Sequence, residues 1–181
     1  MALKATVCKA HLNIADMERQ YYADHDITMA QHPSETDERM MVRLVAFALN
    51  ASPYLQFTRG LSTDDEPELW AKNLTGEVDL WIELGQPDES RIKKACNKAE
   101  QVIVYTYGGR TVPIWWDKVA SAVRQHRNLE IINLPAEATQ ALPEMAGRNM
   151  NLQVVIQDGQ IGVSDGTHHL MIEPETLYPE H

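Results

Sequence analysis

Pro67-Glu68 and Trp81-Ile82-Glu83-Leu84-Gly85 are two short strand-like segments, and each delivers one carboxylate. Glu68 and Glu83 stand fifteen residues apart in the chain, so a hairpin can bring them to one place. Carboxylate oxygens are hard ligands of the kind that Mg²⁺ prefers. A bound Mg²⁺ ion can activate water against a phosphodiester. The two segments therefore predict a Mg²⁺ site that contains Glu68 and Glu83.

The second of these segments belongs to an extended strand over Val78 to Gln86, in which side chains alternate between two faces. One face carries Leu80, Ile82 and Leu84, and the other carries Asp79, Trp81, Glu83 and Gly85. We expect the three aliphatic residues to enter a core. Glu83 is therefore expected on the face away from the aliphatic layer, where Asp79 is interpreted either as an outer ligand or as a solvated strand residue.

The neighbouring segments place this strand in a mixed α/β layer. Short strands are predicted at 55–58 and 68–70, with a polar loop around Gly60 to Asp65 between them, and together with the strand at 78–84 they form a meander. A helix is predicted at 35–50, with Ser34 as its N-cap, and Pro53 ends it. A second helix over 88–100 and a buried strand over 101–107 complete the order αβββαβ. This order is typical of a mixed α/β architecture.

The two ends of the chain predict additional strands around this core. Alternating apolar residues indicate an antiparallel pair over 6–14 and 21–29, interpreted as an accessory layer. Downstream, we expect a helix at 114–126, a strand at 129–134, a short helix at 136–146, and a closing hairpin of 152–157 and 160–163 turned by Asp158-Gly159. A further short strand is predicted at 170–172. No linker or internal repeat interrupts the 181 residues, so the prediction is a single domain over 1–181.

Composition narrows the classes of function. Hydrophobic residues make up 44% of the chain and charged residues 23%, which is typical of a globular protein. No segment is long and apolar enough for a membrane span, and the N-terminus lacks the apolar core of a signal peptide, so we expect a cytoplasmic protein and no membrane partner. Cys8 and Cys96 are predicted to be buried thiols. The net charge of −10 argues against tight non-specific binding to nucleic acid, although a local basic patch can override it.

Several longer phrases carry a family resemblance. They are His32-Pro33-Ser34-Glu35-Thr36, Thr58-Arg59-Gly60-Leu61-Ser62, Trp81-Ile82-Glu83-Leu84-Gly85-Gln86-Pro87 and Val104-Tyr105-Thr106-Tyr107-Gly108. These phrases resemble the bacterial YaeQ family over essentially the whole chain. The αβββαβ order with its two acidic half motifs also resembles the PD-(D/E)XK nuclease-like superfamily. The resemblance implies a restriction-endonuclease-like core, here with an N-terminal hairpin and C-terminal strands added to it.

The resemblance also implies roles for particular residues. Pro67-Glu68 resembles the PD half motif, and Glu83 resembles the acid of the second half. In the superfamily a lysine positions the attacking water. The matching position here is Gly85, so the lysine is missing. Two substitutes are considered. Gln86 is adjacent but faces the other way unless the strand bulges, whereas Lys94 and Lys98 lie one turn apart on the following helix, with Arg91 on the same stripe, and are otherwise a solvated basic edge.

Glu38 completes the list of candidate ligands. It precedes Met41 and Val45 at helical spacing, so it falls at the edge of the buried stripe of the 35–50 helix. The resemblance implies that an acid there assists the metal, giving the set Glu38, Glu68 and Glu83. The alternative is an ion pair with Arg39, Arg43 or Arg59.

Two classes of function remain open from the sequence. One is a Mg²⁺-dependent hydrolase of nucleic-acid phosphodiesters. The other is a catalytically inactive nuclease-like scaffold with a binding or regulatory role and a protein partner. Gly85 in the place of lysine and the acidic net charge favour the second. The sequence leaves the oligomeric state open.

Overall fold

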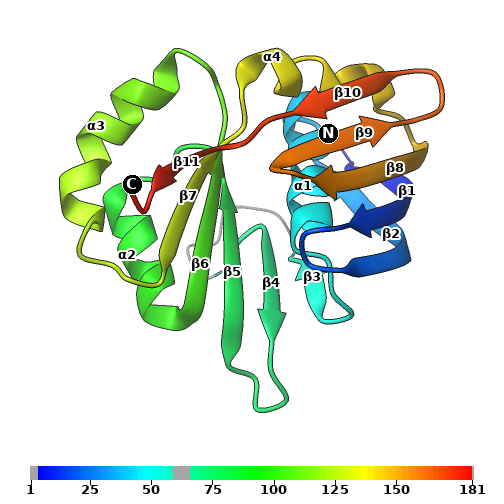
Figure 1. Ribbon diagram of the computed structural model, residues 1–181. Coiled ribbons are helices and arrows are strands. Elements are labelled where there is room, and N and C mark those ends of the chain that lie inside the picture. The colour runs from blue at the N-terminus through cyan, green and yellow to red at the C-terminus, as the bar shows by residue number, and fades with distance from the viewer. Residues whose placement is uncertain (1–3, 59–65, 181) are drawn as a thin grey trace. The chain divides into compact units, whose positions relative to one another are not determined.

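The computed structural model describes residues 4–58 and 66–180 and contains two mixed sheets with helices (Figure 1). The predicted loop around Gly60 to Asp65 and the side chain of Arg59 lie outside the described residues. The chain divides into two compact units. Unit 1 comprises 1–49 and 137–174, and unit 2 comprises 50–136 and 175–181. The prediction of one domain over 1–181 stays a prediction, and each unit is described by itself.

Unit 1 is built on a five-stranded sheet with the order β10-β9-β8-β1-β2. Its elements are β1 (Thr6–Asp16), β2 (Tyr21–Gln31), α1 (Asp37–Leu49), the 3-10 helix η1 (Leu142–Met145), β8 (Asn149–Gln157), β9 (Gln160–Ser164) and β10 (His169–Ile172), together with most of the short helix α4 (Ala136–Thr139). β1 pairs antiparallel with β2 and parallel with β8. The predicted N-terminal hairpin is confirmed, but it forms one continuous sheet with the C-terminal strands instead of an accessory layer, because β1 and β8 share a long parallel register.

Strict alternation of burial explains the sheet of unit 1. Cys8, Ala10, Leu12 and Ile14 of β1 are buried, whereas the residues between them are more exposed. A strand with this period presents one apolar face, and α1 contributes buried residues from Met40 to Ala48 to the same unit. The polar face of β1 stays open. The sequence therefore specified the register directly, since a slip of one residue would expose the apolar face.

The start of α1 differs from the prediction. The backbone amide of Arg39 donates to Oγ1 of Thr36 at 3.1 Å, and the amide of Met40 bonds to the carbonyl of Thr36. Thr36 is therefore the N-cap. Ser34 was predicted for this position, but its hydroxyl is engaged with Nδ1 of His32 at 2.6 Å.

Unit 2 is built on a six-stranded sheet with the order β11-β7-β6-β5-β4-β3. Its elements are β3 (Leu55–Phe57), β4 (Leu69–Lys72), β5 (Val78–Leu84), α2 (Glu89–Lys98), β6 (Ala99–Thr106), α3 (Thr111–Val123), β7 (Leu129–Asn133) and β11 (Glu175–Tyr178). β3, β4 and β5 form the predicted antiparallel meander, and β5, β6 and β7 are parallel. In Figure 1, α2 and α3 lie beside one another next to this sheet.

Three predictions for the second half of the chain needed correction. α3 begins at Thr111 and not at 114, because Pro113 is tolerated within the first turn of a helix, where amides lack intrahelical partners. The helix predicted at 136–146 is divided into α4 and η1. β11 was not predicted, since Glu175 to Tyr178 has no alternating pattern and gains its stability by pairing with β7.

The core of unit 2 lies between the sheet and the two helices. Trp81 of β5 is 1% exposed and packs in one cluster with residues of α2, β6, α3 and β7. Ile82 and Leu84 on the opposite face of β5 are also buried. Glu83 thus shares the face of Trp81, opposite Ile82 and Leu84 as predicted, but that face is also buried. Both faces of this strand are covered, as is usual where a helical crossover joins parallel strands.

Both cysteines are buried thiols, as predicted. Burial raises the pKa of the Cys96 thiol to about 11. Among the described residues, no helix is long and apolar enough to cross a membrane.

Candidate active site at the end of β5

Glu83 is the most deeply buried carboxylate of unit 2 among the described residues. It is 3% exposed and stands next to the last residue of β5, which lies between β4 and β6. Trp81 occupies the same face, and its indole Nε1 donates to Oε1 of Glu83 at 2.9 Å. A buried carboxylate needs such donors, because it has lost its hydration. Glu83 therefore belongs to the fixed interior of the unit and not to its solvated surface.

Arg91 of α2 supplies the positive charge that faces Glu83. Its Nε donates to Oε2 at 3.0 Å, and its Nη2 lies 2.9 Å from Oε1. The same Nη2 also donates to the backbone carbonyl of Glu66 at 2.9 Å. Asp88, the N-cap of α2, accepts a hydrogen bond from the Arg91 amide at 2.8 Å. The start of α2 therefore holds Arg91 in a two-point contact with Glu83.

The electrostatic balance at Glu83 is dominated by burial. Desolvation raises the pKa of the Glu83 carboxyl, and Arg91 and Trp81 act in the opposite direction. The negative charge of Glu68 adds to the upward shift of this pKa. The two predicted carboxylates are therefore close enough in unit 2 to repel one another.

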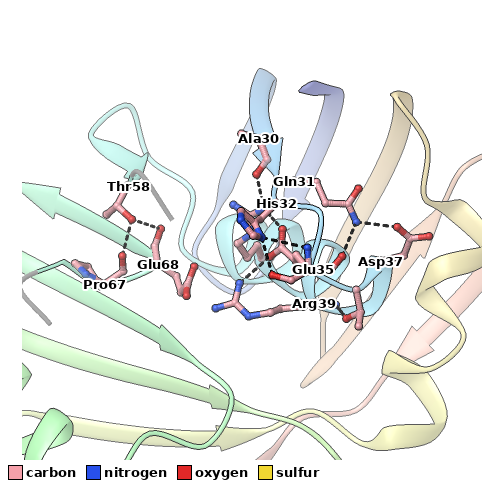
Figure 2. Close-up of polar contacts among 12 residues, drawn as sticks. Ala30, Gln31, His32, Glu35, Asp37, Arg39, Thr58, Pro67 and Glu68 are labelled. Atoms are coloured by element: carbon pink, nitrogen blue, oxygen red, sulfur yellow. Dashed lines mark hydrogen bonds and ion pairs between the residues drawn. The ribbon is translucent and has the colours of Figure 1, made fainter. Parts of the chain in front are cut away.

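Glu68 immediately precedes β4 and lies beside the end of β5. Its backbone amide donates to the carbonyl of Ile82 at 3.0 Å, which joins it to the residue before Glu83. Figure 2 shows the hydroxyl of Thr58 reaching the carbonyls of Pro67 and Glu68, and the bond to Pro67 is 2.6 Å long. One carboxylate oxygen of Glu68, Oε2, is buried. The backbone of Glu68 thus lies beside the end of β5, and a metal site shared by Glu68 and Glu83 stays a prediction.

Gly85 follows β5 with a φ of +88°. This left-handed conformation is readily adopted by glycine and costs other residues free energy, because the β-carbon approaches the carbonyl oxygen. Its amide donates to the carbonyl of Tyr105, so the chain leaves the sheet at this point in a fixed direction. The lysine that the superfamily pattern expects at this position is incompatible with the backbone unless strain is accepted.

Gln86 is exposed and connects β5 to the loop before α3. Its Nε2 donates to the carbonyl of Tyr107 at 3.2 Å and to Oγ1 of Thr111 at 2.7 Å. A β-carbon on Gly108 would lie 3.0 Å from the same nitrogen. Gln86 therefore links the end of β5 to the start of α3 through hydrogen bonds.

Lys94 and Lys98 are exposed on α2. The Nζ atom of Lys98 lies 6.0 Å from the centre of the Trp81 ring and lines a polar hollow with Val78 and Asp79. These two residues belong to the start of β5, whereas Glu83 stands near its end. Arg91, one turn before Lys94, is the residue of this helix that contacts the carboxylate.

Glu38 belongs to unit 1, where it lies half-buried on α1. Its Oε2 accepts a hydrogen bond from Oγ1 of the fully buried Thr139 at 2.9 Å. Of the arginines considered as its partners, Arg39 and Arg43 both pair with Glu35, at 2.7 and 2.5 Å, and Arg59 lies outside the described residues. Figure 2 shows Arg39 beside Glu35. A joint metal site of Glu38 with Glu68 and Glu83 stays a prediction.

A group of three or more His, Cys, Asp or Glu side chains arranged as a metal site occurs in neither unit, over the described ranges. Asp79 is exposed and accepts a hydrogen bond from Asn73 at 3.4 Å, which agrees with a solvated strand residue.

Comparison with known proteins places this chain in a family. A model of the YaeQ protein family matches residues 1–174. The chain belongs to the YaeQ family. It is 50% identical over 173 residues to the YaeQ protein of Salmonella typhi, and 49% identical over 172 residues to that of Escherichia coli K12. These alignments cover 96% and 95%, respectively, of both chains.

Solved structures of the YaeQ family share the fold. The YaeQ protein from Xanthomonas axonopodis pv. citri has a TM-score of 0.92 at 51% identity, over 96% of this chain and 98% of that one. The protein from Pseudomonas syringae also has a TM-score of 0.92, at 36% identity and over 97% of each chain. The mixed α/β architecture with two sheets is therefore that of YaeQ proteins.

The residue that sequence reasoning undervalued in this YaeQ-family chain is Arg91. Its signal was present, because Asp88 begins a helix right after the acidic strand and places Arg91 in the first turn. A strand followed by an antiparallel crossover helix brings that first turn back over the end of the strand. A basic residue in this first turn is therefore predicted to pair with a carboxylate at the end of the preceding strand.

Proposed function

We propose that this YaeQ-family chain is a Mg²⁺-dependent hydrolase of nucleic-acid phosphodiester bonds, with Glu68 and Glu83 as its acidic centre. The observation that supports the proposal is the strand pairing that sets Glu68 beside Glu83, because the Glu68 amide donates to the carbonyl of Ile82 at 3.0 Å. The charge of Glu68 also acts to raise the pKa of Glu83. Acidic side chains that repel one another beside a buried strand end are typical of a site that receives a cation.

The element order supports the same proposal at the level of the fold. α1, β3, β4, β5, α2 and β6 follow one another along the chain, with Pro67-Glu68 before β4 and Glu83 on β5. This order resembles that of the PD-(D/E)XK superfamily, so a restriction-endonuclease-like core belongs to the proposal. Fold alone does not establish activity, so the argument rests on the two carboxylates.

The donor set suits Mg²⁺ in its chemistry. Protein sites for Mg²⁺ commonly supply only one or two carboxylates and leave the remaining positions to water and substrate phosphate. Glu68 and Glu83 would hold the ion. When bound, such an ion lowers the pKa of water and neutralises phosphate charge. The water-orienting role falls to Gln86 or to Lys94 and Lys98. Gln86 would have to give up its hydrogen bonds to Tyr107 and Thr111 for this role.

A Mg²⁺ titration followed by calorimetry tests the proposal together with a cleavage assay on DNA and RNA oligonucleotides. Glu83→Gln and Glu68→Gln are expected to weaken Mg²⁺ binding and to abolish cleavage. Asp79→Asn is the matched control, since it removes an exposed carboxylate from the same strand. Cleavage that persists unchanged in Glu83→Gln would overturn the proposal.

A second function is favoured by a different observation. Arg91 and Trp81 already contact both carboxylate oxygens of Glu83. The position of the superfamily lysine is taken by Gly85, whose φ is positive. A catalytically inactive scaffold with a binding or regulatory role would need only the fold. Absence of Mg²⁺ binding by the wild-type protein, with no cleavage of any oligonucleotide, would favour this second function.

A further inference from the structure

The contact between Arg91 and Glu83 fills the place that a cation would take. The guanidinium donates through Nε and Nη2, one to each carboxylate oxygen, at 3.0 and 2.9 Å. A guanidinium and a carboxylate match in this two-point geometry, which makes the contact both directional and strong. The Glu83 carboxylate therefore already has a resident counter-cation within the chain.

Burial makes this counter-cation necessary. The side chain of Glu83 is 4% exposed, and an ionised carboxylate in such surroundings requires an opposite charge. The Arg91 side chain is 25% exposed, so it is the more accessible member of this ion pair. A cation that binds Glu83 has to compete with the guanidinium for the carboxylate oxygens.

We infer that Arg91 is an exchangeable counter-cation, so that a divalent cation binds Glu83 only in competition with the Arg91 guanidinium. This inference rests on the proposed function, because it takes Glu83 to be a cation ligand. It assigns to Arg91 a positioning role, since the residue acts through Glu83. Lys94 and Lys98, the basic residues considered from the sequence, have no part in it.

The exchange has a consequence for anion binding. When a cation takes over Glu83, the Arg91 guanidinium, whose side chain is 25% exposed, loses the carboxylate that it now contacts. A phosphate group matches the guanidinium fork as well as a carboxylate does. Cation and nucleic-acid phosphate are therefore expected to bind with positive coupling, and each strengthens the other by the same factor.

The test compares Mg²⁺ affinities by calorimetry in the full chain at about pH 8.5, where ordinary carboxyl groups are ionised. Arg91→Gln removes the competitor and is expected to bind Mg²⁺ at least about fivefold more tightly than wild type, at the lower end of typical coupling between ligands. Arg91→Lys keeps the charge but loses the fork, so its affinity is expected between the two. Lys93→Gln, an equal loss of charge at an exposed position of the same helix, is expected to stay within about twofold.

Further variants assign the effect to Glu83. The double substitution Arg91→Gln with Glu83→Gln is expected to lose the gain in affinity completely. Circular dichroism and urea unfolding establish that each variant is folded. If Arg91→Gln does not fold, the Mg²⁺ affinity of Arg91→Lys is compared with that of wild type instead. An affinity of Arg91→Gln no higher than that of Lys93→Gln overturns the inference.

The outcomes separate this inference from the proposed function. Tight Mg²⁺ binding in Arg91→Gln with none in wild type supports the inference and overturns a Mg²⁺-dependent activity of the natural chain. Equal binding in both proteins, with cleavage by wild type, overturns the inference and leaves the proposed function standing. Absence of binding in both overturns both.

The coupling with phosphate is measured with a short single-stranded DNA whose phosphorothioate linkages resist cleavage. Wild type is expected to bind this oligonucleotide more tightly when Mg²⁺ is present, and Arg91→Gln is expected to lose most of that increase. An increase of the same size in both proteins overturns the role of Arg91 in the coupling.

Discussion

The side-chain nitrogen of Gln86 occupies the space into which a β-carbon on Gly108 would point. The separation would be 3.0 Å, and Oγ1 of Thr111 would lie at the same distance. The φ of Gly108 is +124°, a conformation that L-residues rarely adopt. The hydrogen bonds by which Gln86 links the end of β5 to the start of α3 therefore depend on a glycine at position 108.

Gly108→Ala is expected to destabilise the protein by about 1–3 kcal/mol, from backbone strain together with displacement of the Gln86 amide. Urea unfolding of the single and double variants measures both parts. In the Gln86→Ala background the displacement is absent, so the cost of Gly108→Ala is expected to be smaller there. Equal costs in the two backgrounds would show that Gln86 does not constrain Gly108.

Gly85→Lys restores the lysine of the superfamily pattern, and we expect it to reduce stability by about 1–2 kcal/mol. The physical reason is the φ of +88°, because no atom lies within 4 Å of a β-carbon built there. Gly85→Asn is the control, since asparagine tolerates the left-handed region better. Chemical denaturation of the three proteins gives the comparison. A lysine variant as stable as the asparagine variant would contradict the assignment to backbone strain.

His25 and His11 are expected to change the pH dependence of stability in opposite directions. Burial lowers the pKa of His25, whose ring stacks on Tyr21 and meets the edge of Phe47 at 5.1 Å, although Asp24 opposes the shift. Its contribution to stability is present above the ordinary histidine pKa and is lost as pH falls through the lowered value. The hydrogen bond to Asp26, followed by the charges of Asp26 and Asp24, raises the pKa of His11.

The contribution of His11 is therefore present below the ordinary pKa and is lost as pH rises through the raised value. Thermal unfolding between about pH 5 and pH 8 tests both signs. His25→Gln is expected to reduce the loss of stability toward acid, and His11→Gln is expected to reduce the loss toward neutral pH. The same slope in both variants would contradict the opposite environments.

Thr139→Val is expected to destabilise the protein by about 1.5–3 kcal/mol, because it removes the hydroxyl that donates to the carboxylate of Glu38. Thr139 is fully buried and the bond is 2.9 Å long, so water cannot easily replace the donor. Thr28→Val is the matched control, since Thr28 is exposed on β2. Equilibrium unfolding in urea should separate the two variants. Equal stabilities would show that the bond to Glu38 contributes little.

Much of the fold could be predicted from local patterns. The alternation in β1 and β8, the apolar stripes of α1 and α2 and the Asp158-Gly159 turn each have a period or a turn chemistry that is readable without tertiary contacts. β11 lacked such a pattern, because its residues are ordered by pairing with β7. The division into two units was not visible either, since the chain passes from one unit to the other without a linker of distinctive composition.

The candidate site was predicted in part. Glu68 and Glu83 were expected together because strand pairing is local along the chain, and the pairing of β4 with β5 sets their backbones side by side in unit 2. Arg91 was placed on the right helix but was passed over in favour of Lys94 and Lys98. Helical periodicity predicts which face of α2 a residue lies on. It does not predict which turn of that face packs over the end of β5, where Arg91 meets Glu83.

The sequence by itself determined the family, most of the helices and strands and the pairing of two acidic strand ends, because each of these rests on residues near one another in the chain. Only the tertiary structure decided that Glu83 is buried, that Arg91 neutralises it and that Gly85 adopts a positive φ. Burial and ion pairing depend on which elements cover a strand, and local periodicity carries no information about that covering.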